Sequence, residues 1–307
     1  MGWGAPGGAR PSKLVAPGTV VAREACLWPQ IPHPNPPPRG GRGKSGNAMK
    51  DMFDLAGKVA VVTGSTKGIG KAIAEAFAQF GAKVAVSSRK ADACDRVADA
   101  INGAGGQAIA VPCNISHKDQ LQNLIDRTRA HWGRIDILVC NAAVNPHFGS
   151  ALDIPDSAFE KVMRCNIEST LWLCQMVAPE MRARKDGAII IVSSIGGLRG
   201  SAELGAYSIS KAADMQIARN LAVEFGPDNI RVNCIAPGLV RTDFARALWQ
   251  DPERAAAREA ATPLRRLGEA EDIAGAAVYL ASRAGAWTTG QTLVVDGGTT
   301  VSPGGRP

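Results

Sequence analysis

The sequence predicts an α/β fold in which a mostly parallel, seven-stranded sheet carries helices on both faces. Short apolar runs alternate with longer stretches of helical periodicity, which is the pattern of βαβ units. The 307 residues are 45% hydrophobic but only 5% aromatic and include 34 glycines, a composition that suits a buried parallel sheet better than a sandwich. No apolar run approaches 18 residues, so we expect no transmembrane helix and no membrane partner.

Seven apolar runs have the length of strands, at residues 58–63, 83–88, 107–112, 135–140, 187–193, 230–235 and 291–295. Helical patterns fill the intervals, at about 68–80, 91–103, 117–132, 155–185, 202–225 and 270–283. Right-handed crossovers between such elements place the strands in one sheet. Residues 243–268 are less regular, contain Pro252 and Pro263, and are expected to form short helices over one edge. Because no long structureless loop or change of composition interrupts residues 49–307, we predict a single domain there.

Residues 1–48 differ in composition from the rest of the chain. They are rich in Gly and Pro and show no hydrophobic period. Such a segment cannot bury enough apolar surface to fold, and its prolines prevent the amphipathic helix of a mitochondrial transit peptide. We predict a disordered extension, which a start assigned upstream of Met49 or Met52 would explain.

The distribution of charge and cysteine argues against several classes of partner. Residues 1–50 hold seven basic residues and only Glu24 as an acid, which accounts for +6 of the net charge of +7. The remainder is nearly neutral, so we expect no nucleic-acid partner; binding by the tail alone would depend on salt and vanish with the tail. The seven cysteines are scattered without a Cys-x-x-Cys pair, which predicts no metal site and reduced thiols in the cytoplasm.

A glycine-rich turn, residues 63–70, separates the first predicted strand from the first predicted helix. Glycines there permit a tight turn, close approach of the backbone to a pyrophosphate, and close packing of helix on strand. The helix N-terminus also attracts the anion. A glycine motif alone is weak, but this position predicts a Rossmann-type, doubly wound dinucleotide-binding domain. The expected cofactor contacts are Gly64, Ser65, Lys67, Gly68, Ile69 and Gly70.

The end of the second predicted strand favours NADP(H) over NAD(H). An NAD-binding protein usually has an acidic residue there for the ribose hydroxyls, whereas this chain has Ser88, Arg89 and Lys90. Arg89 and Lys67 can pair with a 2′-phosphate, the arginine through a bidentate contact. The alternative is that Arg89 and Lys90 only begin a solvated helix.

A serine, a tyrosine and a lysine supply groups for proton transfer. Ser194 follows the fifth predicted strand, and Tyr207 lies 13 positions later. Tyr207 and Lys211 are at i and i+4 of a predicted helix, which makes their side chains neighbours. An ammonium about 4 Å from a phenol stabilises the phenolate by about 4 kcal/mol at an effective dielectric of about 20. The helix has one apolar face, marked by Ile209, Ala213, Ile217, Leu221 and Phe225.

These motifs resemble the short-chain dehydrogenase/reductase family over residues 54 to about 300, and most of all its NADP-dependent carbonyl and retinol reductases. Asn141-Ala142-Ala143 after the fourth strand and Pro237-Gly238 after the sixth match further family elements. The resemblance implies an NAD(P)-dependent oxidoreductase acting on CH–OH groups. Two positions depart from the family: Ala143 replaces a glycine, and Asn114 stands where an aspartate commonly touches the adenine.

The resemblance also implies residue roles. Tyr207 is the implied general acid/base, and Ser194 orients the substrate. Lys211 stabilises the phenolate and holds the nicotinamide ribose, while Asn166 anchors a water of the proton relay. The implied cofactor contacts outside the glycine turn are Ser88, Arg89, Asn114, Asn141, Ala142, Tyr207, Lys211, Pro237, Gly238 and Thr242. The family further implies a homodimer or homotetramer.

The expected substrate is a small carbonyl or alcohol bound by Ser194, Tyr207, Phe148 and Trp249. Phe148, Trp249 and also Phe244 would form an apolar pocket for an aliphatic or aromatic carbonyl. They fit the ordinary packing of a lid equally well.

Two other functions are compatible with this fold. A reductase of carrier-bound 3-oxoacyl thioesters needs a basic entrance, for which Arg199, Arg265 and Arg266 are the only candidates. A non-catalytic dinucleotide sensor is the second, and the complete set of Ser, Tyr, Lys and Asn argues against it.

Removing residues 1–48 is expected to leave turnover and melting temperature unchanged, because a segment without an apolar period contributes nothing to a core. The full chain and a chain beginning at Met49 would be compared by NADPH oxidation and thermal unfolding. A large loss of either property would contradict the prediction.

Overall fold

The computed structural model describes residues 50–302, so the extension predicted for residues 1–48 lies outside the described part of the chain. One seven-stranded sheet has the order β3-β2-β1-β4-β5-β6-β7, and each neighbouring pair is parallel. The strands are β1 (Val59–Thr63), β2 (Lys83–Ser87), β3 (Gln107–Ala110), β4 (Ile137–Cys140), β5 (Gly187–Val192), β6 (Ile230–Pro237) and β7 (Thr292–Val295). The predicted fold class is confirmed.

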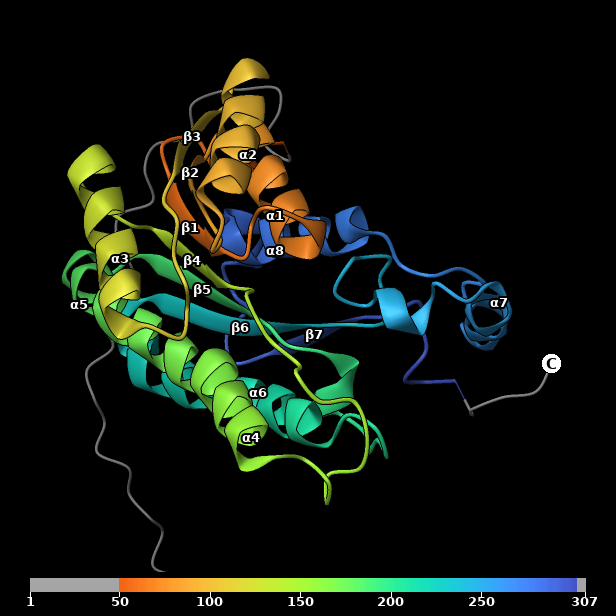
Figure 1. The fold of residues 1–307 in the computed structure, drawn as a ribbon. Helices are drawn as coiled ribbons and strands as arrows, with labels where there is room; N and C mark the ends of the chain where they lie inside the picture. The colour runs from red at the N-terminus through yellow and green to blue at the C-terminus, as the bar shows by residue number, and fades with distance from the viewer. Residues whose placement is uncertain (1–49, 303–307) are drawn as a thin grey trace, which may run out of the picture. The chain divides into compact units, whose positions relative to one another are not determined.

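Helices cover both faces of the sheet (Figure 1). One face carries α1 (Gly68–Gln79), α2 (Ala91–Gly103) and α8 (Ala270–Ala281), and the other carries α3 (Lys118–Trp132), α5 (Ser169–Arg184) and α6 (Gly205–Phe225). Single-turn 3-10 helices lie at Lys50–Met52, Ile195–Gly197, Gly226–Asp228, Arg246–Leu248 and Arg283–Gly285. Because helices pack on both faces, the inner strands are buried throughout and consist of continuous apolar runs.

The helix predicted over residues 155–185 is interrupted by a change of helical type. It consists of α4 (Asp156–Val162), a π-helical turn (Met163–Glu168) and α5. Two hydroxyl groups donate to carbonyl oxygens of this turn: Ser169 to that of Cys165 at 2.6 Å, and Thr170 to that of Asn166 at 3.1 Å. Asn166 lies within the π-helical turn and is buried.

The apolar stripe predicted on α6 is buried only in part. Phe225, at its C-terminal end, lies in the core, whereas Ile209, at its N-terminal end, is 55% exposed. The buried side of the helix also carries the polar residues Ser210, Lys211 and Asp214. Polar groups in such a place need internal partners, so this face belongs to the site and not only to the core.

Residues 243–268 form the expected excursion. It contains α7 (Pro252–Ala261), whose first turn is capped by the Asp251 side chain. No side chain of α7 is buried, and the helix projects from the sheet (Figure 1). Within residues 50–302, no helix has the length and apolar character needed to span a membrane.

Candidate active site

The predicted site residues gather at one edge of the sheet, where the parallel strands have their carboxyl ends. The glycine turn follows β1, Ser88 follows β2, Asn141 follows β4, and Ser194 follows β5. Pro237 ends β6 and leads to Gly238 and Thr242. The strand order reverses between β1 and β4, and ligands of doubly wound sheets bind at that switch point.

Asn141 holds the glycine turn in place. Its Nδ2 donates to the carbonyl oxygens of Thr63 at 2.9 Å and Gly64 at 3.3 Å, and its backbone N–H donates to the Thr63 hydroxyl at 3.1 Å. The glycines make this approach possible. A Cβ on Gly70 would lie 2.4 Å from both Asn141 Nδ2 and the Gly64 oxygen, and a Cβ on Gly64 would lie 3.0 Å from the same Nδ2.

The N-terminus of α1 fits an anionic ligand. No side chain caps it, and its first turn contains no acidic residue, so its free amides and dipole face outward from the turn. Gly68 has a φ of +54°, and a Cβ there would lie 2.9 Å from Cγ2 of Thr242. The glycine turn and the loop after β6 therefore lie side by side. Lys67 and Asp243 form an exposed ion pair across them at 3.7 Å.

Ser65 is placed differently from the other predicted cofactor residues. Its side chain is fully buried and donates to the Val62 oxygen at 2.7 Å, while it accepts from the Ser87 N–H at 2.9 Å. Its backbone N–H donates to the Ser87 oxygen at 3.0 Å. The hydroxyl therefore links the turn to β2. Being buried and hydrogen-bonded inside the protein, it is not itself available to a cofactor.

Ser88 and Arg89 lie directly after β2. The Ser88 hydroxyl lies 3.4 Å from Cys94 Sγ on α2. Arg89 is exposed and, within residues 50–302, takes part in no ion pair. The nearby acid Asp92 is already paired with Arg96 at 2.9 Å. A free guanidinium thus stands at the strand end where the sequence predicts a 2′-phosphate.

Asn114, after β3, uses its side-chain oxygen locally. Oδ1 accepts from the hydroxyl of Ser116 at 3.0 Å and from its N–H at 3.2 Å. The amide NH2 is therefore the part of Asn114 that can meet an adenine, where an aspartate would only accept hydrogen bonds.

Ser194 and Tyr207 both border Gly196. A Cβ built on Gly196 would be 3.4 Å from Ser194 Oγ and 3.9 Å from Cε1 of Tyr207. Ser194 Oγ accepts the Gly196 N–H at 3.0 Å, so its own proton remains available for donation. The serine that follows β5 and the tyrosine of α6 are therefore neighbours, as the spacing predicts.

Lys211 is nearly inaccessible, with 3% of its surface exposed. Its Nζ donates to the carbonyl oxygen of Val192 at 2.9 Å and to Asp214 Oδ2 at 2.9 Å, and it lies 5.7 Å from the centre of the Tyr207 ring. Asp214 was not among the expected site residues. Its spacing from Lys211, i and i+3 on one helix, was the only sequence signal for this contact.

Asn166 has its side chain fully engaged between two elements. Oδ1 accepts the Val144 N–H at 2.9 Å, and Nδ2 donates to the Val144 oxygen at 3.1 Å and to the Ser210 hydroxyl at 3.0 Å. The side chain thus connects the π-helical turn, the loop after β4 and α6. A part in a proton relay stays a prediction.

The three aromatic residues of the expected pocket behave differently. Phe244 lies beside Tyr207, with ring centres 6.0 Å apart. The indole N–H of Trp249 donates to the carbonyl oxygen of Thr242 at 3.1 Å, so this bond lies within the segment that follows β6. Phe148 is 53% exposed. Its loop pairs with the segment before α6, where the Gly149 N–H donates to the Glu203 oxygen at 2.9 Å.

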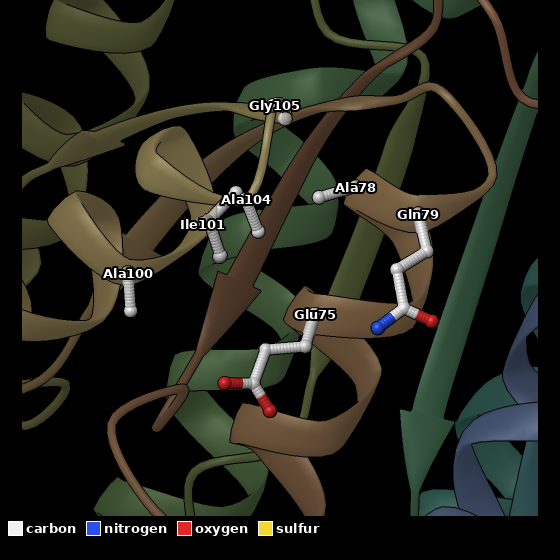
Figure 2. A pocket seen from close by; sticks show the side chains of 8 residues that line it. Glu75, Ala78, Gln79, Ala100, Ile101, Ala104 and Gly105 are labelled. Carbon is white, nitrogen blue, oxygen red and sulfur yellow. The ribbon is translucent and has the colours of Figure 1, made fainter.

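A separate surface hollow lies between the C-terminal parts of α1 and α2 (Figure 2). Glu75 and Gln79 project from α1, opposite Ala100 and Ile101 of α2. These helix ends lead to the amino ends of β2 and β3, so the hollow is at the edge of the sheet opposite the site. It contributes nothing to the constellation described above.

Two comparisons of sequence decide the family. The family model described as Enoyl-(Acyl carrier protein) reductase matches residues 64–300. Dehydrogenase/reductase SDR family member 4 of Homo sapiens is 42% identical over 255 residues, which cover 83% of this chain and 91% of that protein. The chain belongs to the short-chain dehydrogenase/reductase family. It is accordingly an NAD(P)-dependent oxidoreductase acting on CH–OH groups, and a non-catalytic sensor is set aside.

Other members of the short-chain dehydrogenase/reductase family agree in sequence and structure. Tropinone reductase-like 3 of Erythroxylum coca is 39% identical over 243 residues, covering 79% of this chain and 93% of that protein. A 7 alpha-hydroxysteroid dehydrogenase, solved with NADH and 7-oxo glycochenodeoxycholic acid, has a TM-score of 0.78 at 41% identity and covers 81% of this chain and 96% of its own. A gluconate 5-dehydrogenase from Burkholderia cenocepacia, solved with NADP and tartrate, has a TM-score of 0.79 at 30% identity, with coverages of 82% and 99%.

Replacing Gly70 by Ala is expected to weaken dinucleotide binding at least about tenfold and to destabilise the fold by about 1–3 kcal/mol, because the new methyl group would overlap a backbone oxygen and the Asn141 amide. NADPH fluorescence titration and thermal unfolding measure the two effects. Gly103→Ala is the matched control, since a Cβ there meets nothing within 4 Å. Equal behaviour of the two variants would contradict the prediction.

Proposed function

We propose that this enzyme uses NADP(H) to interconvert a carbonyl and a primary or secondary alcohol, with Tyr207 as general acid and base. The main support is that Tyr207 lies near both Ser194, with which it borders Gly196, and the Lys211 ammonium, whose Nζ is 5.7 Å from the ring centre. A phenol acts in proton transfer near neutral pH only if its anion is stabilised, and a buried ammonium is the group that provides this.

In reduction, Tyr207 donates its proton to the carbonyl oxygen of the substrate while Ser194 donates a hydrogen bond to the same oxygen. In oxidation, the Tyr207 phenolate removes the hydroxyl proton of the alcohol. The bound cofactor supplies or accepts the hydride at carbon. Lys211 has one ammonium proton beyond those given to Val192 and Asp214, and we assign it to the ribose. Asn166 keeps α6 in register with the loop after β4.

The residues at the carboxyl edge of the sheet fit a dinucleotide. The uncapped N-terminus of α1 suits the pyrophosphate. Because the Lys67–Asp243 pair is exposed, giving it up for a phosphate costs little. The solved relatives include one with NADH and one with NADP, so the preference must come from this chain's own residues. Ser88 in place of a carboxylate and the free guanidinium of Arg89 support NADP(H).

The proposed substrate is an aliphatic or aromatic carbonyl compound. Phe244 beside Tyr207 supplies an apolar wall next to the reacting oxygen. The carrier-bound 3-oxoacyl alternative is less well supported, because two of its basic candidates have internal partners. Arg266 is paired with Asp272 at 2.6 Å, and Arg265 donates to the Ala260 oxygen. A screen of NADPH oxidation over ketones, aldehydes, quinones and 3-oxoacyl thioesters separates the two. The homodimer or homotetramer and the cytoplasmic location stay predictions.

Arg89→Ala is expected to lower kcat/KM for NADPH by about 10–100-fold and to leave that for NADH within about threefold, because a charge-assisted bidentate contact is worth about 1.5–3 kcal/mol. Steady-state kinetics with both cofactors measure this. Arg96→Ala is the control, since Arg96 already has Asp92 as its partner. A wild-type preference for NADH would refute the NADP(H) assignment.

Tyr207→Phe is expected to retain NADPH binding and to lose turnover by about 10²–10⁴-fold, because proton transfer is lost while the ring remains. Tyr279→Phe is the matched control. Tyr279 is the second of two tyrosines in the chain, and its hydroxyl bonds Thr288 at 2.7 Å on the rim of β7. Turnover and NADPH fluorescence would be measured on both variants. A near-normal rate in Tyr207→Phe would overturn the assignment.

A further inference from the structure

A buried carboxylate on α6 has no part in the reaction as described so far. Asp214 is 1% exposed, and its Oδ2 accepts from Lys211 Nζ at 2.9 Å. Its other oxygen, Oδ1, is buried without a hydrogen-bond partner in the described part of the chain. A buried carboxylate that makes one hydrogen bond is unfavourable for stability. Its position beside Lys211 therefore calls for a functional explanation.

The position of Lys211 depends on this contact. The ammonium lies between the carbonyl oxygen of Val192, the last residue of β5, and the carboxylate of Asp214. The same ammonium lies near Tyr207, whose ring centre is 5.7 Å from Nζ. Two hydrogen bonds to separate elements leave Lys211 little freedom, so Asp214 and Val192 together determine where the positive charge stands.

The surroundings of the pair contain few other charges. Within residues 50–302, the titratable groups that act on Lys211 are Asp214 and Tyr207 of α6 and Cys234 of β6. Cys234 donates from Sγ to the Asp214 backbone oxygen at 3.3 Å, and burial raises the pKa of its thiol well above the usual range. A hydrogen bond with Cys174 of α5, together with burial, likewise raises the pKa of Cys140 on β4. Both thiols are neutral, so Asp214 is the anion of this cluster.

Burial and the ion pair act on Lys211 in opposite directions. Burial alone lowers the pKa of the Lys211 ammonium, but the Asp214 carboxylate beside it reverses this and raises it. Burial raises the pKa of Asp214, and Lys211 opposes that change. Asp214 thus keeps Lys211 charged in a buried place. The same carboxylate also reduces the positive potential that the ammonium produces at nearby groups.

We propose that Asp214 is a positioning residue that holds Lys211 as a fixed cation and offsets part of its charge at Tyr207. The inference rests on the proposed role of Tyr207 and deepens it. A carboxylate near a phenol disfavours the phenolate. The carboxylate therefore cancels part of the stabilisation that the ammonium gives to the Tyr207 anion, and the site favours the acid form that carbonyl reduction uses.

Asp214→Asn tests this, because the Asn oxygen still accepts from Lys211 while the negative charge is gone. In this variant the acid limb of the pH profile of kcat/KM for alcohol oxidation is expected to lie at a pH about one unit lower than in the wild type. The reason is that oxidation needs the phenolate, which is more stable without the nearby negative charge. Asp214→Leu is the second variant. It removes the acceptor as well as the charge, so the buried lysine loses the group that holds it as a cation, and its limb is expected to move to higher pH. Asp228→Asn, a surface acid paired with Arg182 at 2.6 Å, should leave the profile unchanged. An unmoved or rising limb in Asp214→Asn, or a falling limb in Asp214→Leu, would overturn the proposal.

A readout without turnover separates this inference from the proposed function. The chain has two tyrosines, so ¹³C-tyrosine NMR gives two ring signals, and Tyr279→Phe assigns them. The Tyr207 signal should titrate about one pH unit lower in Asp214→Asn than in the wild type. No difference would refute the role of Asp214 even if Tyr207→Phe is inactive. A shifted signal with an unshifted activity profile would instead refute Tyr207 as the catalytic acid/base.

Discussion

The contact between Asn141 and the glycine-rich turn is the constraint on which the site depends. β1 and β4 are neighbours at the point where the strand order reverses, and the Asn141 amide joins their ends by bonding the carbonyl oxygens of Thr63 and Gly64. The amide occupies space that a Cβ on Gly64 or Gly70 would need. Turn and amide therefore form one unit, which directs the N-terminus of α1 outward, where its free amides fit an anion.

A second set of long-range contacts holds Ser194, Tyr207 and Lys211 in the same site as the glycine-rich turn. β5 ends in Val192, whose carbonyl oxygen receives the Lys211 ammonium, and Ser194 follows two residues later. The π-helical turn brings Asn166 between the loop after β4 and α6, where it is hydrogen-bonded to Val144 and Ser210. The residues proposed for proton transfer are thus held by contacts from three different segments.

The family members that this chain resembles include a 7 alpha-hydroxysteroid dehydrogenase and a gluconate 5-dehydrogenase, so membership of the family does not determine the substrate. The elements suited to selecting it are the loop of Phe148, which pairs with the segment before α6 at Glu203, and the excursion that carries Phe244 and α7. α7 buries no side chain. Sparse burial is typical of elements that move on binding, in contrast to the fully buried strand ends beneath them.

The sequence by itself determined the order of strands and helices, the glycine turn and the Ser194, Tyr207 and Lys211 set, because periodicity and turn chemistry are properties of near neighbours in the chain. It did not predict the buried polar residues of α6 or the π-helical turn, because both depend on partners far away, such as Val144 for Asn166. Asp214 shows the difference most clearly. Its spacing places it next to Lys211, but only the packing of α6 against β5 and β6 removes water from the pair and makes its charges matter for Tyr207.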